Sequence, residues 1–236
     1  MTLVEHLAEL RRRLFIALVA IAVGAVLAFI AYNRILAVLR EPLCDFARRH
    51  ENTSCRFLVT SPLDPFAIRL QIATYAGFVI ASPVVFWQLW RFVAPGLHAH
   101  EKRYAVSFII SSIVLFAAGA SLAYITAPKA LDFLLQIGGS QLDVRLNPTR
   151  YLTLITLMIV AFGVSFEFPV FLVFLLLVGA LSTRSLRRWR RYAAVGITIF
   201  AAVITPSQDP YTMLGMAVPM YLFYEASILI GRALRR

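Results

Sequence analysis

The chain has 236 residues, of which 60% are hydrophobic and only 15% are charged, and its mean hydropathy is +0.78. A soluble domain of this size cannot bury that much apolar surface, so the composition excludes that class and indicates an integral membrane protein. The net charge of +11 does not indicate a nucleic-acid-binding protein, because the basic residues lie between apolar runs rather than on a soluble face.

Six apolar runs predict six membrane-spanning helices in a single all-α membrane domain that covers residues 1–236. The runs are 14–31, 67–93, 104–126, 151–178, 192–204 and 211–230. The first run follows three arginines and could be mistaken for a secretory signal. Its eighteen residues exceed the apolar core of about 7–15 residues in such signals, and no clear small-residue cleavage site follows, so we interpret it as a retained helix.

The distribution of basic residues predicts the orientation of the chain. Six spans put both termini on one side, and four short segments on that side carry 14 of the 23 Lys and Arg residues. Because short cytoplasmic segments are enriched in Lys and Arg, we expect both termini to be cytoplasmic.

The last two spans are short. Residues 192–204 and 211–224 provide thirteen and fourteen residues around a proline-containing turn, before Glu225 interrupts the second run. At 1.5 Å per residue each covers about 20 Å, against a hydrocarbon core of about 30 Å. We expect two short C-terminal helices that either thin the bilayer or lie low in it with a sunken turn.

The longer extracytoplasmic connections are expected at residues 32–66 and 127–150. The first contains both cysteines, Cys44 and Cys55, in the compartment where disulfides persist. The two thiols either form a structural bridge around ten intervening residues or are unrelated free cysteines. Pro42, Pro62 and Pro65 favour a fixed shape for this loop.

Glu167 is the single charged residue in the long apolar stretch 151–181. A carboxylate inside the membrane costs roughly 2.5–3.5 kcal/mol on the insertion scale, unless it protonates or finds a partner. Nothing in its own span neutralises it, so the partner lies on another helix, in water or on another protein. Pro169 removes a backbone hydrogen bond two residues later and predicts a kink there.

Two acidic residues lie in the expected cytoplasmic segments, among many basic ones. Glu9 could simply pair with Arg12 or Arg13 at helical spacing, and Glu101 could be neutralised by the two basic residues that follow it. If both are free, they form an acidic pair that suits a ligand with two guanidinium groups, because arginine binds carboxylates bidentately and lysine does not.

The motifs around these acids resemble those of the TatC family, the multi-spanning subunit of the twin-arginine protein translocase. The similar residues follow the family order from one end of the chain to the other: His6-Leu7-x-Glu9-Leu10-Arg11-x-Arg13; Pro83, Gln88, Trp90, Phe92, Pro95, Leu97 and Glu101-Lys102-Arg103; Phe162-Gly163-x-x-Phe166-Glu167-x-Pro169; Thr205-Pro206 with Asp209; and Pro219 with Glu225. One departure is that two residues separate Pro206 from Asp209, where some relatives have one.

The resemblance implies a receptor and core subunit, located in the cell (cytoplasmic) membrane, that binds the paired arginines of signal peptides on folded cargo. Glu9 and Glu101 would receive the arginines, while Arg11, Arg13 and Arg103 shape the site. The remaining residues expected at this signal-peptide site are Leu10, Phe92, Pro95 and Leu97.

The resemblance also implies a curved arrangement of helices whose concave interior contains Glu167. There the acid would meet a polar group on a single-span TatA or TatB subunit, or attract water, with Gln88 and Pro169 beside it. A purely structural acid, bonded to Gln88 or to a neighbouring hydroxyl, is the alternative. Pro62 and Asp209 are expected in extracytoplasmic turns, and self-association is expected.

A different function remains open from the residues alone: a proton-coupled secondary transporter of a small solute that uses Glu167. The sequence has no matching interrupted helices in its two halves, which argues against it. An enzyme is not expected, because no embedded Ser/His pair, paired aspartates or nucleotide-binding loop is present. No cofactor is expected, and His98 and His100 lack a third metal ligand at suitable spacing.

Overall fold

The computed structural model describes residues 3–49, 57, 61–93, 105–137, 147–207 and 209–233, and these residues form helices and connections without any β-strand. The helices are α1 (Leu3–Ile30), α2 (Tyr32–Arg49), α3 (Asp64–Val93), α4 (Ala105–Ile137), α5 (Pro148–Ser165), α6 (Phe168–Leu177), α7 (Thr183–Arg188), α8 (Arg190–Ile204) and α9 (Pro210–Ala233). The expected all-α class is confirmed.

Five segments of the described chain are long and apolar enough to cross a membrane. They are Val4–Ile30, Asp64–Val93, Val106–Leu135, Pro148–Leu177 and Pro210–Ala233. The sixth expected span corresponds to α8, whose 15 residues cover about 22 Å and fall short of a bilayer core of about 30 Å. The short length expected for this helix is therefore confirmed, whereas a sixth helix of full spanning length is not present among the described residues.

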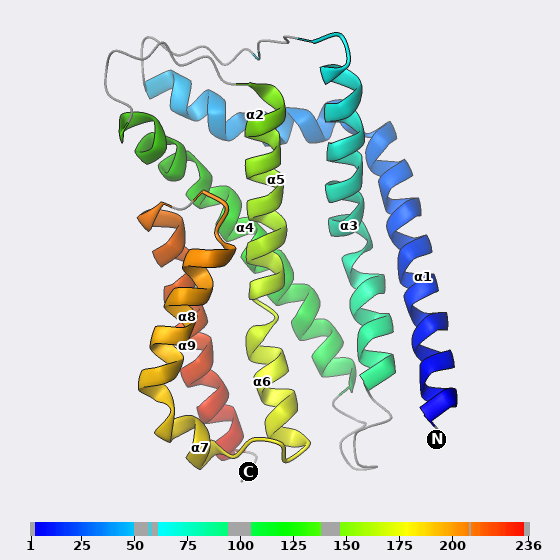
Figure 1. Cartoon of the computed structure of the whole chain (residues 1–236), viewed down its shortest axis with the longest axis vertical. Coiled ribbons are helices and arrows are strands. Elements are labelled where there is room, and N and C mark those ends of the chain that lie inside the picture. Colours follow the sequence, from blue (N-terminus) through cyan, green and yellow to red (C-terminus); the bar gives the residue numbers. More distant parts are fainter. Residues whose placement is uncertain are drawn as a thin grey trace.

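The long helices stand side by side, and the described ends of the first and last helices lie at one end of the molecule (Figure 1). Helix α1 packs along α3, while α4 runs obliquely and contacts α5 and α9. Helices α5 and α6 stand in the middle of the view, and α7, α8 and α9 form the side opposite α1. Helix α2 lies across the end away from the termini.

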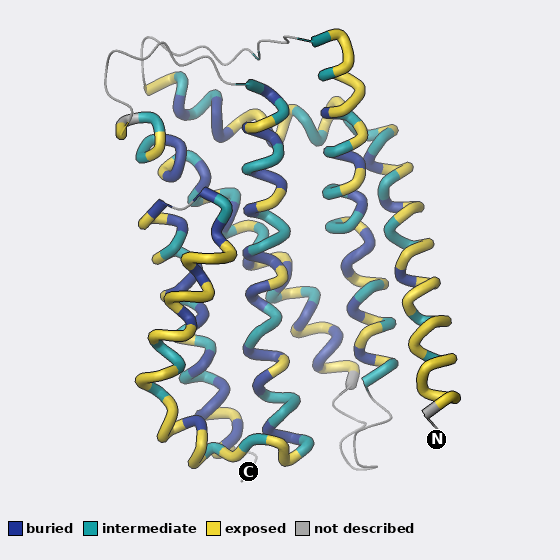
Figure 2. Tube along the Cα trace, viewed as in Figure 1, coloured by how far each residue is buried: buried dark blue, intermediate teal, exposed yellow. Residues whose placement is uncertain are grey.

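Exposed positions recur along the long helices (Figure 2), and many of them are large hydrophobic residues, as a hydrocarbon solvent requires. Val26 and Ile30 on α1 are 61% and 74% exposed, and Val203 on α8 is 77% exposed. A buried core still lies between the helices, with Ile72, Leu152 and Met216 among its fully enclosed members. The helices are therefore apolar on both their inner and outer faces, which is the pattern of a membrane bundle.

Two glycines allow α1 and α3 to cross at close range. A Cβ on Gly24 would lie 2.5 Å from the carbonyl oxygen of Gly77, and a Cβ on Gly77 would lie 2.4 Å from the backbone nitrogen of Ala25. Small residues at such crossings let backbones approach and maximise van der Waals contact in lipid. This crossing holds α1 against α3 and so fixes the first site described below.

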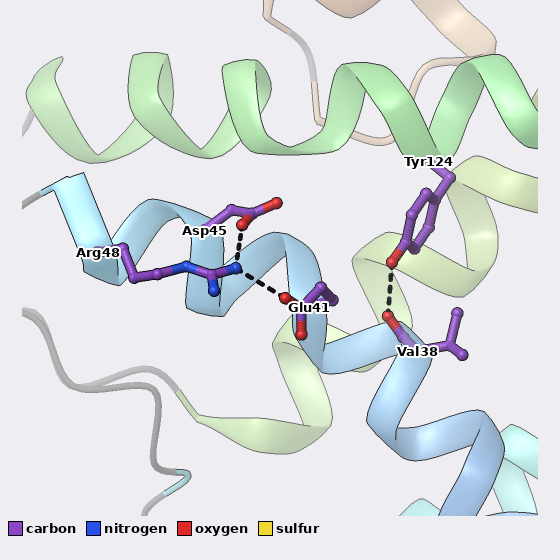
Figure 3. A network of polar contacts seen from close by, with 5 residues as sticks. All are labelled: Val38, Glu41, Asp45, Arg48 and Tyr124. Atoms are coloured by element: carbon purple, nitrogen blue, oxygen red, sulfur yellow. Dashed lines mark hydrogen bonds and ion pairs between the residues drawn. The ribbon is translucent and has the colours of Figure 1, made fainter.

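The expected loop at residues 32–66 is corrected by the structure, because its first half is helix α2. The helix buries Leu39, Leu43 and Phe46 on one face and contains Pro42. Its polar face carries Arg48, which bonds Glu41 at 2.7 Å and also Asp45 (Figure 3). An amphipathic helix of this kind was missed because the search followed continuous apolar runs.

Two tyrosines from neighbouring helices hold α2 in place. The hydroxyl of Tyr124 on α4 donates to the carbonyl oxygen of Val38 at 2.9 Å (Figure 3). The hydroxyl of Tyr151 on α5 donates to the carbonyl oxygen of Leu39, also at 2.9 Å. These bonds fix α2 across the ends of the long helices.

Two helices are longer than expected. Helix α4 continues to Ile137 rather than ending at 126, since it buries Ala127, Ala130 and Leu131 and accommodates Pro128 within the helix. Helix α9 has 24 residues, so the expectation of a short helix there is wrong, while its bounds agree with the expected span 211–230 that includes Glu225. By contrast, the kink expected beside Pro169 is confirmed, because α5 ends at Ser165 and α6 begins at Phe168.

Candidate functional site

An open cleft of about 560 Å³ lies between the first turns of α1 and the last turns of α3. Its lining combines acids, bases and an amide from the two helices: Glu5, Ala8, Glu9, Arg12, Arg13, Ile16, Gln88 and Arg91. The cleft exists because the close crossing of α1 and α3 positions these two helix ends side by side. A cleft with both signs of charge suits a charged ligand better than an apolar one.

Glu9 is joined to Arg13, one turn further along α1. Nε of Arg13 donates to Oε1 of Glu9 at 3.0 Å, and Nη2 contacts the same oxygen. Nη1 of Arg13 donates to Oε1 of Gln88 on α3 at 3.4 Å. The local pairing that the sequence allowed for Glu9 is therefore present, with Arg13 rather than Arg12. Both contacts use Oε1, and the structure records no contact of Oε2 within the described residues.

The other residues expected at the cytoplasmic site have different positions. The ring of Phe92 stacks on His6 with centroids 4.5 Å apart, which closes one end of the α1–α3 pair. Leu10 and Arg11 are exposed on α1 and do not line the cleft. Pro95, Leu97, Glu101 and Arg103 lie outside the described residues, so the expected pairing of the two acids stays a prediction.

Glu167 lies at the break between α5 and α6 and makes no capping hydrogen bond with its side chain. The hydroxyl of Ser112 on α4 donates to its carboxylate, while the same hydroxyl accepts a bond from Nε1 of Trp90 on α3 at 2.9 Å. Ser112 is fully buried. Three helical segments therefore meet at this acid. Of the two structural partners considered from the sequence, a hydroxyl is present and Gln88 bonds Arg13 instead.

One oxygen of Glu167 is left without a partner. Oε1 is buried and has no hydrogen bond within the described part of the chain. The acid borders a pocket of about 390 Å³ that is lined mainly by apolar side chains of α3, α5, α6 and α8, including Leu89, Val164, Phe171 and Phe200. An unpaired carboxylate oxygen beside an apolar pocket is costly and therefore suits a polar group brought in by a partner.

The turn between α8 and α9 has a self-contained polar network. Oδ1 of Asp209 accepts the backbone N–H of Thr212 at 2.8 Å and so caps α9. The hydroxyls of Ser207 and Thr212 are 2.8 Å apart, and all three side chains are buried. Their mutual bonds account for the polar residues of this turn. Pro62 lies in the turn before α3. Cys44 is disulfide-bonded, while Cys55 lies outside the described residues.

Sequence reasoning missed Ser112 as a site residue. It lies in the middle of an apolar run, and small polar residues are common inside membrane helices, where they usually bond their own backbone. The sequence nevertheless contained a signal. The hydroxyl of Ser112 and the indole N–H of Trp90 lie on two other expected spans and can donate hydrogen bonds to an embedded acid. Trp90 was quoted only as part of a motif.

A protein-family sequence model described as "Sec-independent protein translocase protein (TatC)" matches residues 5–219 of the chain. The chain belongs to the TatC family. Sec-independent protein translocase protein TatC of Frankia casuarinae is 44% identical over 98% of this chain, which spans 65% of that relative's length. The protein of the same description from Aquifex aeolicus is 38% identical over 100% of this chain and 97% of its own length.

Solved structures agree with this assignment. A crystal structure titled "Twin Arginine Translocase Receptor- TatC" superimposes with a TM-score of 0.79 and 36% identity, and covers 98% of this chain and 100% of its own. A second structure of that receptor, in DDM, gives a TM-score of 0.80 with 37% identity over 96% of this chain and 99% of its own. The chain is thus a multi-pass membrane protein of a protein translocase family.

Proposed function

We propose that this TatC-family chain is the receptor and core subunit of a twin-arginine translocase in the cell membrane. It binds the Arg-Arg signal peptides of folded cargo in the cytoplasmic cleft between α1 and α3, and it recruits single-span TatA- or TatB-type subunits. The observation that carries the receptor role is Glu9 in that cleft, with Oε1 engaged by Arg13 and no contact of Oε2 recorded within the described residues. The first turns of α1, which line this cleft, and the last described turn of α9 lie at the same end of the molecule (Figure 1), which is consistent with N-in, C-in topology.

The pairing of Glu9 with Arg13 does not block a second guanidinium. A carboxylate has two oxygens and about four acceptor positions, and Arg13 occupies positions on Oε1 only. Arg13 is in turn held by Gln88, so Glu9 is fixed in direction before a ligand arrives. The basic residues around the cleft repel any positive group of a ligand that does not lie on a carboxylate. This repulsion favours a fixed binding register for a peptide with two arginines.

Glu167 supports the second part of the proposal. Glu167 borders an apolar pocket in which a single-span helix can pack, and its buried Oε1 has no hydrogen bond within the described part of the chain. A polar side chain on such a helix would gain a hydrogen bond that lipid cannot supply. Ser112 and Trp90 hold the carboxylate toward this position.

A photo-crosslinking experiment tests the receptor role. A photoreactive residue replaces Ala8, which lines the cleft, and in a control chain it replaces Val203, which is exposed on α8. Membranes with each chain receive a signal peptide with Arg-Arg or with Lys-Lys in its place. The proposal predicts crosslinks from position 8 that fall strongly with the Lys-Lys peptide, and none from position 203. Equal crosslinking from both positions would show that the peptide binds elsewhere.

A further inference from the structure

A second charged pocket lies where α7, the beginning of α8 and the end of α9 meet. Its volume is about 560 Å³, and five of its six lining residues are arginines: Thr183, Arg184, Arg187, Arg188, Arg190 and Arg232. Of these arginines, only Arg190 has a recorded acidic partner in the described chain, Glu225 of α9 at 2.5 Å. The remaining four positive charges face one another across an open pocket.

The pocket is held rigidly rather than formed by a loose basic loop. The hydroxyl of Tyr224 on α9 donates to the carbonyl oxygen of Leu186 in α7 at 2.7 Å, and Leu186 is itself buried. A Cβ on Gly231 would lie only 2.5 Å from Cγ2 of Thr183, so α9 and the first turn of α7 touch. The packing of α7 against α9 therefore brings the arginines together. Like charges at close range repel one another, and a bound anion relieves this repulsion.

The surrounding side chains place this pocket at the depth of lipid headgroups. Trp189 and Tyr192 beside it are 63% and 76% exposed, and their rings lie 6.5 Å apart. Exposed aromatic residues of these two types concentrate at membrane–water interfaces. Leu229, one turn before the end of α9, is 61% exposed and belongs to the apolar surface. A phosphate in the pocket can thus belong to a molecule whose acyl chains lie along α8 and α9.

We propose that this pocket binds the phosphate headgroup of an anionic membrane lipid. Guanidinium groups bind phosphate oxygens bidentately, and basic pockets between membrane helices select anionic headgroups. The site is separate from the cleft that contains Glu9 and from the pocket beside Glu167. Its role does not depend on signal-peptide binding.

The test uses the full-length chain in neutral detergent, with bound lipids counted by native mass spectrometry during titration with phosphatidylglycerol. The test variant combines Arg184→Gln with Arg232→Gln, and the control combines Arg34→Gln with Arg40→Gln, two exposed arginines of α2 at the other end of the molecule. The first pair should weaken phosphatidylglycerol binding by about tenfold or more, and the second should leave it unchanged. Phosphatidylcholine should bind weakly to all three chains.

Three results would overturn the proposal. Equal loss in the control pair would show that total charge, not this pocket, retains the lipid. Competition by inorganic phosphate at equal concentration would show a site for a free anion, and competition by an acidic peptide alone would indicate a protein ligand. If the double variant does not fold, Arg184→Lys with Arg232→Lys keeps the charge, and it should still bind several-fold more weakly than the wild type because the bidentate geometry is lost.

Discussion

The carboxylate of Glu9 and the guanidinium of Arg13 form an ion pair one helical turn apart on α1, and the same guanidinium continues to Gln88 on α3. The pair is partly buried, with 21% and 18% of the two side chains exposed. An exposed pair at this spacing would contribute only a few tenths of a kcal/mol. Because Arg13 also bonds Gln88 on α3, the ion pair orients Glu9 within the cleft.

This relationship predicts the effect of removing Arg13. The variant Arg13→Gln releases Glu9 from its fixed direction, so an Arg-Arg signal peptide should bind several-fold more weakly, on the order of one charge-assisted hydrogen bond. Titration of a fluorescent peptide against the purified chain measures the change. Arg34→Gln on α2 serves as the control and should bind as the wild type does. Tighter binding by Arg13→Gln would show that Arg13 competes with the peptide instead.

Glu167 should affect transport without affecting signal-peptide binding. Glu167→Ala removes the unpaired acceptor beside the apolar pocket, so recruitment of single-span subunits and export should fall strongly while peptide affinity stays unchanged. Copurification of the subunits, an export assay and a peptide titration give the three readouts. Loss of solute uptake with intact export of folded cargo would instead favour a transporter.

Ser112 should act by positioning Glu167. Ser112→Ala removes the hydroxyl that joins Trp90 to the acid, so recruitment should fall, though less than in Glu167→Ala. The neighbouring Ser111 is exposed on the same helix and provides a matched control. Equal effects of Ser111→Ala and Ser112→Ala would show that the helix surface, rather than the hydrogen-bonded chain, matters.

The long apolar helices could be predicted from the sequence because hydrocarbon solvent allows little else. An uninterrupted apolar run such as that of α1 must satisfy its backbone internally, so it forms a helix wherever it crosses the membrane. The break beside Glu167 could be predicted for the same local reason, since Pro169 removes a hydrogen bond. These features depend on a residue and its near neighbours only.

The features that were missed depend on contacts between distant residues. Helix α2 is stabilised by burial of Leu39 and Leu43 and by the tyrosines of α4 and α5, none of which is visible as an apolar run. Helix α9 is longer than the short helix expected, and Arg190 of α8 neutralises Glu225 within it. The choice of Arg13 over Arg12 likewise depends on Gln88, 75 positions later in the chain.

The crossing of α1 and α3 predicts a strong effect of a single methyl group. Gly77→Ala would place a Cβ against the backbone of α1, so the helices must separate, with a cost of about 1–3 kcal/mol typical of overpacking. Thermal unfolding in detergent measures it. A Cβ on Gly196 of α8 would meet nothing within 4 Å, so Gly196→Ala should be neutral or slightly stabilising. Equal midpoints for the two variants would contradict this packing.

The anchoring of α2 can be tested through the hydroxyl of Tyr151. Tyr151→Phe keeps the ring but leaves the carbonyl of Leu39 without this donor, which should lower the free energy of unfolding by about 1 kcal/mol. Tyr192, which is 76% exposed, gives a control. Tyr192→Phe removes the hydroxyl of an exposed residue and should have little effect. No difference between the variants would show that α2 is held by its apolar face alone.

The most direct test of the receptor role is the affinity of an Arg-Arg signal peptide for Glu9→Lys. Glu41→Lys, which changes the same charge at an exposed position on α2, is the matched control. The account predicts that Glu9→Lys loses binding by at least a hundredfold, because a carboxylate that attracts a guanidinium becomes an ammonium that repels it, while Glu41→Lys binds normally. Normal binding by Glu9→Lys would contradict the assignment of the cleft.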